Sequence, residues 1–126
     1  MASARLRQLM VLSRDVAKST QFYQQGLGLP LIRQSDSFSE FDLQAGVTLS
    51  IKQAHGEAVC SAGYSPFLNF DVEDMMETIP RLITLGASMD GPIKYPAFGK
   101  VAAVRSPDGT MIGLYESNTM ESATSA

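Results

Sequence analysis

The chain repeats one order of elements in its two halves, and this repeat is the strongest restriction on its fold. Asp15 and Asp74 each precede a segment with apolar residues at helical spacing, and they lie 59 positions apart. Near the end of each half, Gly46 and Gly109 occupy the turn between two strand-like segments and lie 63 positions apart. The pattern predicts β-α-β-β-β in each half. Because neither half has enough apolar surface to stand alone, we expect both to share one architecture.

Short segments rich in β-branched and aliphatic residues predict the strands, and glycines and prolines separate them. The predicted strands are residues 6–12, 31–34, 38–43, 47–53, 67–72, 87–89, 100–105 and 110–116. One helix should begin after Asp15 and end near Gly26, and the other should run from Asp74 to Gly86. Asp74 and Glu77 have the spacing of a capping box, whereas Pro80 should kink or delay the second helix.

The chain has 126 residues, a length that favours a single domain. We expect one module at about residues 5–53, a linker at 54–65 and a second module at about 66–116. The small, polar tail at 117–126 is expected to be disordered. The sequence therefore predicts one domain made of two modules, with little structure outside them.

Composition excludes several classes of partner. The formal net charge is -3 and the pI is about 5.0, with the basic residues scattered, which argues against nucleic acid and acidic membranes. No apolar stretch approaches the roughly 20 residues of a membrane span, and no apolar leader is apparent at the N-terminus. Cys60 is the only cysteine, so it cannot form an internal disulfide. These features predict a cytoplasmic protein.

Three segments together resemble a known superfamily. The residues VLSRD at 11–15, followed by Ser19, Phe22-Tyr23 and Leu27-Gly28-Leu29, resemble the first module of the vicinal oxygen chelate proteins, which include glyoxalases, bleomycin-resistance proteins and dioxygenases. The residues SPDGTMIGLYE at 106–116 are similar to their closing hairpin, and Leu85-Gly86-Ala87 also matches. The resemblance covers about residues 6–116. It implies an α+β fold of two βαβββ modules, with curled mixed sheets around a cavity and helices on the convex face.

The resemblance also locates the positions at which metal-dependent relatives carry their ligands. Those relatives use His, Gln or Glu from the first and last strand of each module, and the matching positions here are Gln8, Ser50, Phe67 and Gly113. Phenylalanine and glycine side chains have no lone pair, and a serine hydroxyl is a poor ligand for a divalent metal. His55, the sole histidine, lies in the linker. We therefore expect no metal and no cofactor.

Strand alternation extends this set to a predicted ligand-binding surface. Residues two positions from the four family positions should share their face, whereas Leu9, Val11, Ile112 and Leu114 should pack under the helices. Two aromatic residues, Tyr95 and Phe98, lie in a loop that often covers a ligand in related proteins, although they could equally anchor that loop. The full set is Gln8, Met10, Ser50, Lys52, Phe67, Asn69, Tyr95, Phe98, Met111, Gly113 and Tyr115. Alternatively, these side chains simply fill the space.

Gly113 has a particular role in this prediction, because a glycine within a strand leaves room beside the backbone. If Gly113 leaves an empty space, replacing it with Leu should leave stability nearly unchanged and should block the pocket. A filled core predicts a loss of about 1–3 kcal/mol instead.

Mixed apolar and polar lining is typical of a small-molecule pocket. We expect a metal-independent protein that binds or sequesters a small apolar or amphipathic molecule, and the resemblance implies a homodimer. An alternative is a lyase, isomerase or other enzyme of the superfamily with a non-standard site, using Glu40, Asp42 or Asp71 as general base. A third possibility is a degenerate member that contacts only protein partners. No Ser-His-Asp set can form around His55, and no glycine-rich phosphate loop is present.

Overall fold

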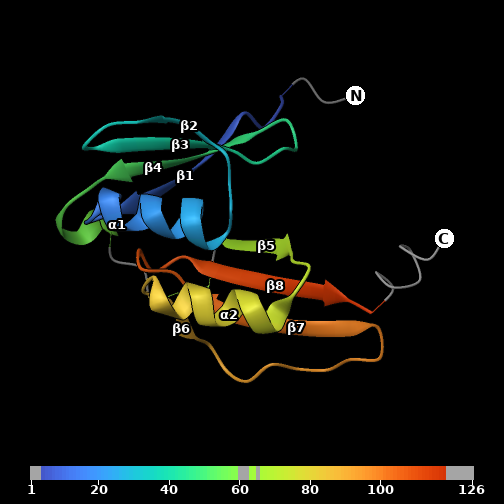
Figure 1. Ribbon diagram of the computed structural model, residues 1–126. Coiled ribbons are helices and arrows are strands. Elements are labelled where there is room, and N and C mark those ends of the chain that lie inside the picture. Colours follow the sequence, from blue (N-terminus) through green and yellow to red (C-terminus); the bar gives the residue numbers. More distant parts are fainter. Residues whose placement is uncertain (1–3, 60–62, 65, 119–126) are drawn as a thin grey trace. The chain divides into compact units, whose positions relative to one another are not determined.

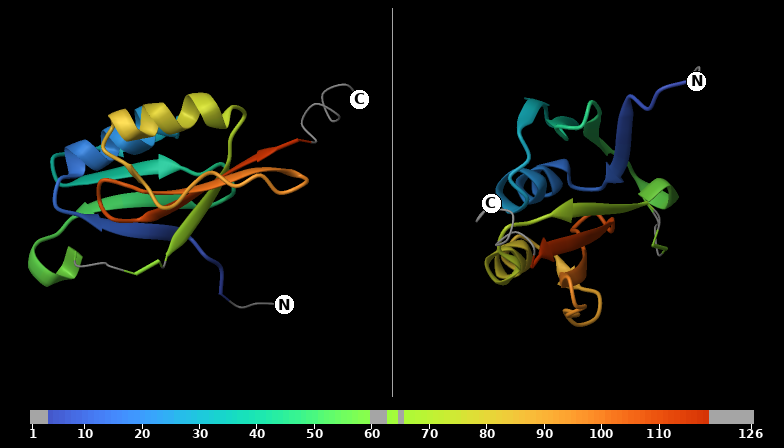
Figure 2. Two further views of the ribbon diagram at one scale, coloured as in Figure 1. Left: turned by 90° about the horizontal axis from the view of Figure 1, so that it is seen from below. Right: turned by 90° about the vertical axis from the view of Figure 1, so that its right-hand side faces the viewer.

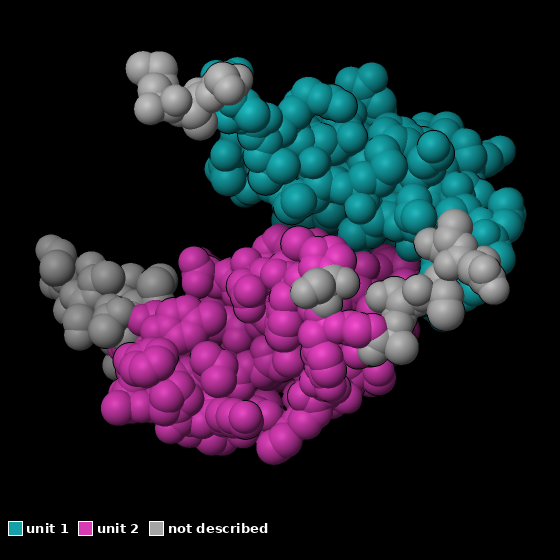
Figure 3. Space-filling model, turned by 180° about the vertical axis from the view of Figure 1, so that it is seen from behind, with its two compact units in different colours: residues 1–60 teal, residues 61–126 magenta. Residues whose placement is uncertain are grey.

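The computed structural model describes residues 4–59, 63–64 and 66–118, and Figure 1 shows the elements along the chain. Contacts divide the chain into two compact units, residues 1–60 and residues 61–126, which Figure 3 distinguishes by colour. Each unit contains one four-stranded mixed sheet and one α-helix. The α+β class predicted from the sequence is confirmed.

The first unit carries four strands, two short irregular helices and α1. Its elements are β1 (Gln8–Ser13), α1 (Val16–Gln21), the π-helix η1 (Phe22–Gly26), β2 (Leu31–Gln34), β3 (Phe38–Asp42), β4 (Thr48–Gln53) and the 3-10 helix η2 (Gly56–Val59). The strand order is β1-β4-β3-β2, with β1 parallel to β4 and the other pairs antiparallel.

The second unit repeats this topology. Its elements are β5 (Phe67–Asp71), α2 (Met75–Thr84), β6 (Ser88–Met89), β7 (Gly99–Arg105) and β8 (Met111–Ser117). The order is β5-β8-β7-β6, with β5 parallel to β8. In the first unit Gln8 pairs with Thr48, and in the second Phe67 pairs with Met111. Phe67 follows Gln8 by 59 positions, and Met111 follows Thr48 by 63 positions, which are the offsets of the sequence repeat. The strand register therefore confirms the repeat.

Both predicted helix caps are present. The Asp15 side chain accepts a hydrogen bond from the backbone N–H of Lys18, and the Asp74 side chain accepts from Met76 and Glu77. These carboxylates satisfy N–H groups that have no partner within the helix. Pro80 does not delay α2, which is continuous from Met75 to Thr84 with the Pro80 side chain exposed.

The first helix differs from its prediction in its second half. Regular α-helix ends at Gln21, and the backbone N–H of Leu27 donates to the carbonyl of Phe22, five residues earlier, at 3.2 Å. Phe22 and Tyr23 are adjacent, yet both are fully buried and meet edge to face with ring centroids 5.1 Å apart. The wider π turn accommodates two consecutive buried rings, a demand that apolar spacing alone does not reveal.

In each unit the α-helix lies against one face of its sheet, as Figure 2 shows from two further directions, and the buried side chains lie between helix and sheet. Val11, Phe41, Leu49 and Ile51 are buried on the α1 side of the first sheet. In the second unit the buried strand residues are Ala102, Val104, Ile112 and Leu114, and α2 contributes Met75, Ile79 and Leu82. The prediction that Val11, Ile112 and Leu114 belong to the core is confirmed.

The predicted tail begins too early. Ser117 is the last residue of β8, and Asn118 donates from its backbone N–H to the carbonyl of Phe98 at 2.9 Å. The rest of the tail, 119–126, lies outside the described residues, as does Cys60. Within the described ranges, no helix is long and apolar enough to cross a membrane.

Candidate functional site

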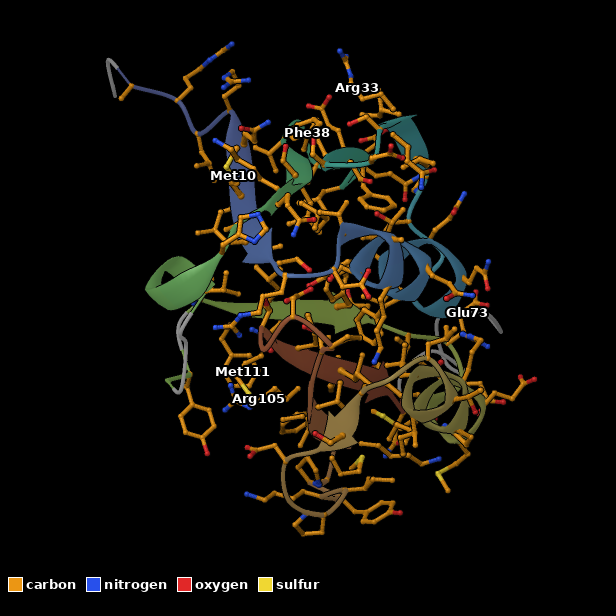
Figure 4. All side chains as sticks on the ribbon, turned by 90° about the vertical axis from the view of Figure 1, so that its left-hand side faces the viewer. Met10, Arg33, Phe38, Glu73, Arg105 and Met111 are labelled. Carbon is orange, nitrogen blue, oxygen red and sulfur yellow. The ribbon has the colours of Figure 1, made fainter. Side chains whose placement is uncertain are left out.

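Each sheet has an open face, which we define as the face opposite its own helix. In the first unit the strand register places three short rows of side chains on this face. The rows are Gln8, Met10 and Leu12 on β1, Thr48, Ser50 and Lys52 on β4, and Phe38, Glu40 and Asp42 on β3. Figure 4 shows Met10 projecting from β1 away from α1, and its side chain is 47% exposed.

The two family positions of the first unit meet on this face. The Gln8 amide nitrogen Nε2 donates to Ser50 Oγ at 2.5 Å, and Ser50 is fully buried. In metal-dependent relatives these positions would hold ligand atoms. Here a hydrogen bond joins the two side chains across β1 and β4, so the Ser50 hydroxyl already has a partner within the sheet.

Two carboxylates considered as general bases have partners within the first unit. Glu40 Oε1 lies 2.8 Å from Arg33 Nε, and Asp42 Oδ1 accepts from the backbone N–H of Gln44 at 2.7 Å. Gln44 has a φ of 59°, so the Asp42 contact stabilises a backbone conformation that non-glycine residues rarely adopt. Both carboxylates therefore have structural roles. Asp71, the third candidate, is exposed at the end of β5.

A hollow of about 340 Å³ lies on the open face of the second sheet, and we call it the β7–β8 hollow. Four residues of the predicted site border it: Phe67 and Asn69 from β5, and Gly113 and Tyr115 from β8. The strand register brings Phe67 and Asn69 beside β8, where Asn69 pairs with Gly113 and Asp71 with Tyr115. The second pair of family positions, Phe67 and Gly113, therefore meets at this hollow.

The prediction that Gly113 leaves an empty space is wrong. A Cβ atom at Gly113 would overlap Asn69 Oδ1 and lie 3.1 Å from Phe67 Cε1. The missing side chain is thus replaced by the Asn69 carboxamide, which folds against the backbone of β8. Leu at this position would have to displace both neighbours, so we now expect it to destabilise the protein by about 1–3 kcal/mol.

The other predicted residues of the second unit do not line the hollow. Met111 is only 1% exposed, and it pairs with Arg105 on the adjacent strand, as Figure 4 shows. Tyr95 and Phe98 are largely exposed. The Phe98 ring lies 6.0 Å from that of Tyr115, whose hydroxyl donates to the Phe98 carbonyl at 3.2 Å. These contacts agree with the alternative prediction that Phe98 anchors its loop to the second sheet.

One wall of the hollow was not predicted. Asp90, Pro92 and Lys94 border it, although none of them was in the predicted set of site residues. The backbone N–H of Asp90 donates to the Ala103 carbonyl at 2.8 Å, and Lys94 and Val101 exchange hydrogen bonds at 2.9 and 3.0 Å. The segment therefore runs along β7 almost as an additional strand, and the Gly91-Pro92 pair in the sequence gave no signal of this.

The Arg105 side chain forms its hydrogen bonds and its ring contact within the second unit. Its Nη1 donates to the carbonyl oxygens of Gly63 at 3.2 Å and Gly109 at 2.9 Å, and its guanidinium carbon lies 5.5 Å from the centre of the Tyr64 ring. His55 is exposed beyond β4. Among the described residues, no group of three or more His, Cys, Asp or Glu side chains has a geometry that could hold a metal ion.

Comparison with known proteins identifies the family. The model of the Glyoxalase/Bleomycin resistance protein/Dioxygenase superfamily matches residues 5–114. The chain belongs to this superfamily. Comparison with curated proteins gives no significant match.

Solved structures share the fold of this superfamily member at low identity. A glyoxalase/bleomycin resistance protein/dioxygenase family enzyme from Burkholderia phytofirmans PsJN is 20% identical, with a TM-score of 0.75 over 90% of this chain and 99% of that chain. TnmS3, an antibiotic binding protein from Streptomyces sp. CB03234, is 23% identical, with a TM-score of 0.67 over 94% and 99%. The fosfomycin resistance protein FosX from Mesorhizobium loti is 18% identical, with a TM-score of 0.68 over 98% and 99%. These similarities establish the fold.

Proposed function

We propose that the protein binds or sequesters a small apolar or amphipathic molecule at the β7–β8 hollow, without a metal ion. The observation that carries this proposal is the hollow itself. Its volume of about 340 Å³ is within the range of small-molecule pockets, and aromatic walls combine with a few polar groups. An antibiotic binding protein among the structural neighbours supports the same kind of role.

The residues at the family positions support a role without metal. Phe67 and Gly113 offer no donor atom, and Gln8 donates to Ser50. A single remaining amide oxygen is too weak a ligand set for a divalent ion. Binding is favoured over catalysis because Glu40 and Asp42, two candidate bases, are engaged by Arg33 and by the Gln44 backbone.

We further propose a cytoplasmic homodimer. The superfamily resemblance and the open edge strands support dimerisation, because β1 and β2 flank the first sheet and β5 and β6 the second. A single cysteine fits a reducing compartment.

The test of binding uses a variant that fills the hollow. Ala103 faces Gly113 across β7 and β8 and is partly exposed, so Ala103→Leu places three extra carbons in the hollow. Ligand-observed NMR with a panel of uncharged apolar molecules should show saturable binding to the native protein and none to Ala103→Leu. The control is Ala17→Leu on the exposed side of α1, which should bind normally.

Melting temperatures of both variants should stay close to that of the native protein, since solvent-facing substitutions typically change stability by less than about 0.5 kcal/mol. If the Ala103→Leu variant still binds the molecules, the proposed location of the binding site is contradicted. The absence of any saturable binding across the panel would contradict the function.

A further inference from the structure

Small residues lie at the centre of the floor of the β7–β8 hollow. Ala103 lies opposite Gly113, so neither residue contributes a side chain that extends beyond a Cβ atom. The Asn69 carboxamide lies against Gly113 and occupies the place of a side chain at that position. Its Nδ2 is 3.4 Å from the Phe67 carbonyl oxygen, which keeps the amide near the sheet. The floor therefore consists of small groups, which are the Ala103 methyl group, the Gly113 backbone and the Asn69 carboxamide.

Larger groups stand on the sides of this floor. The Phe67 ring is 42% exposed on the β5 side, Tyr115 closes one end, and Pro92 and Lys94 form the opposite side. The floor spans β8 and β7, with β5 on one side and the segment that carries Asp90 and Lys94 on the other. The hollow above this floor has a volume of about 340 Å³, which is enough for a small ring system.

The charges at the hollow cancel. Among the described residues that border it, only Asp90 and Lys94 are charged, and both belong to the same wall. Asp90 is half-buried, and its Oδ1 accepts from the Tyr64 hydroxyl at 3.4 Å, whereas Lys94 is exposed. Together with the Asn69 amide, this wall offers both donors and acceptors but no net charge. A ligand with a net charge would gain attraction from one residue and repulsion from the other.

We infer that the β7–β8 hollow binds a flat, uncharged aromatic molecule with hydrogen-bonding groups at its edge. This inference rests on the proposed function and narrows its ligand class. The ring lies on the floor of Ala103 and the Asn69 amide, beside the Phe67 ring, and its polar edge meets Asp90 and Lys94. Stacking on a planar surface gains contact over the whole ring, whereas a globular molecule of equal carbon number would touch only part of the floor.

The test of shape compares two uncharged ten-carbon alcohols, 2-naphthol and 1-adamantanol, by calorimetric titration of the native protein. We expect 2-naphthol to bind at least about tenfold more tightly, a difference of about 1.4 kcal/mol. Ala103→Leu should abolish its binding and Ala17→Leu should not. If 1-adamantanol binds as tightly as 2-naphthol and both are lost in Ala103→Leu, the inference is overturned and the proposed function stands. If neither alcohol binds up to millimolar concentration, and the wider panel also fails, both are overturned.

The test of charge uses 2-naphthoate and 2-naphthylmethylammonium beside 2-naphthol. The native protein should prefer the uncharged alcohol. Asp90→Asn should shift the preference toward 2-naphthoate by about threefold, and Lys94→Gln toward the ammonium by a similar factor, since one unit charge at about 6 Å in a wet site contributes that much. A tenfold preference of the native protein for either ion, or two variants with unchanged preferences, would overturn the uncharged assignment.

Discussion

Replacing Gly113 with Ala should destabilise the protein only while Asn69 is present. The backbone of Gly113 has no positive φ, so alanine fits the strand and restricts the unfolded chain, a gain of about 0.4–1 kcal/mol. The new Cβ, however, would overlap Asn69 Oδ1. Rotating that side chain away sacrifices its contact with the Phe67 carbonyl and forces a less favourable rotamer, at about 1–2.5 kcal/mol in total.

The expected net loss for Gly113→Ala is therefore about 0.5–1.5 kcal/mol, or a decrease in melting temperature of about 2–6 °C for a chain of this length. In the Asn69→Ala background the overlap is gone, and the same change should be neutral or slightly stabilising. Only the 3.1 Å approach to Phe67 Cε1 remains, and it is common to both backgrounds.

The measurement is a double-mutant cycle by urea unfolding, with an expected coupling of about 1–1.5 kcal/mol between positions 69 and 113. Gly63→Ala is the matched control. Gly63 has no atom within 4 Å of an added Cβ and no positive φ, so its effect should be the same in both backgrounds. Additive behaviour at Gly113, within about 0.5 kcal/mol, would refute the placement of Asn69 over β8.

Three further predictions concern metal, association and a helix cap. Since Phe67 and Gly113 cannot coordinate, elemental analysis should find no stoichiometric divalent ion and chelator should leave the melting temperature unchanged; about one ion per chain would contradict the proposal. Sedimentation should report about twice 13.6 kDa, and a monomer at micromolar concentration would refute the dimer. Glu116→Ala should lower the unfolding free energy by about 1–2 kcal/mol, because Glu116 Oε1 accepts a hydrogen bond from the Met75 N–H at 2.6 Å. Lys100→Ala removes only the ion pair to Glu116, so it should change the unfolding free energy by less than about 1 kcal/mol. Equal effects would show that the cap contributes little.

The elements and their register were largely predictable because they follow from periodicity. Alternation placed Phe67 and Asn69 on one face, and both prove exposed, while Val11 and Ile112 are buried on the other. The offsets of 59 and 63 positions predicted an internal repeat, and the strand register of the two units has the same offsets. Such patterns depend on backbone geometry, which a single sequence expresses directly.

The finer details of the site depend on rotamers and long-range backbone contacts, which periodicity does not contain. Asn69 fills the space beside Gly113 through one choice of side-chain torsion angles. The Asp90–Lys94 wall exists because a loop forms hydrogen bonds with β7. Glu116 caps α2 from a strand 41 residues away in sequence, which no local pattern indicates. Each of these needs knowledge of which distant groups meet.

The pairing of first strand with last strand has a consequence for how the chain folds. Gln8 pairs with Thr48 across 40 positions and Phe67 with Met111 across 44, whereas the hairpins Asp42–Thr48 and Arg105–Met111 each close over 6. Closing the longer loop costs about 1.7 kcal/mol more in chain entropy. The hairpins β3–β4 and β7–β8 should therefore form early, and β1 and β5 should dock late.

During synthesis, the N-terminal strand of each unit would emerge about 40 residues before its partner, leaving its apolar side chains without a sheet for several seconds at ribosomal speed. Substitutions in β1 or β5 should therefore mainly accelerate unfolding, and substitutions in the hairpins should mainly slow folding.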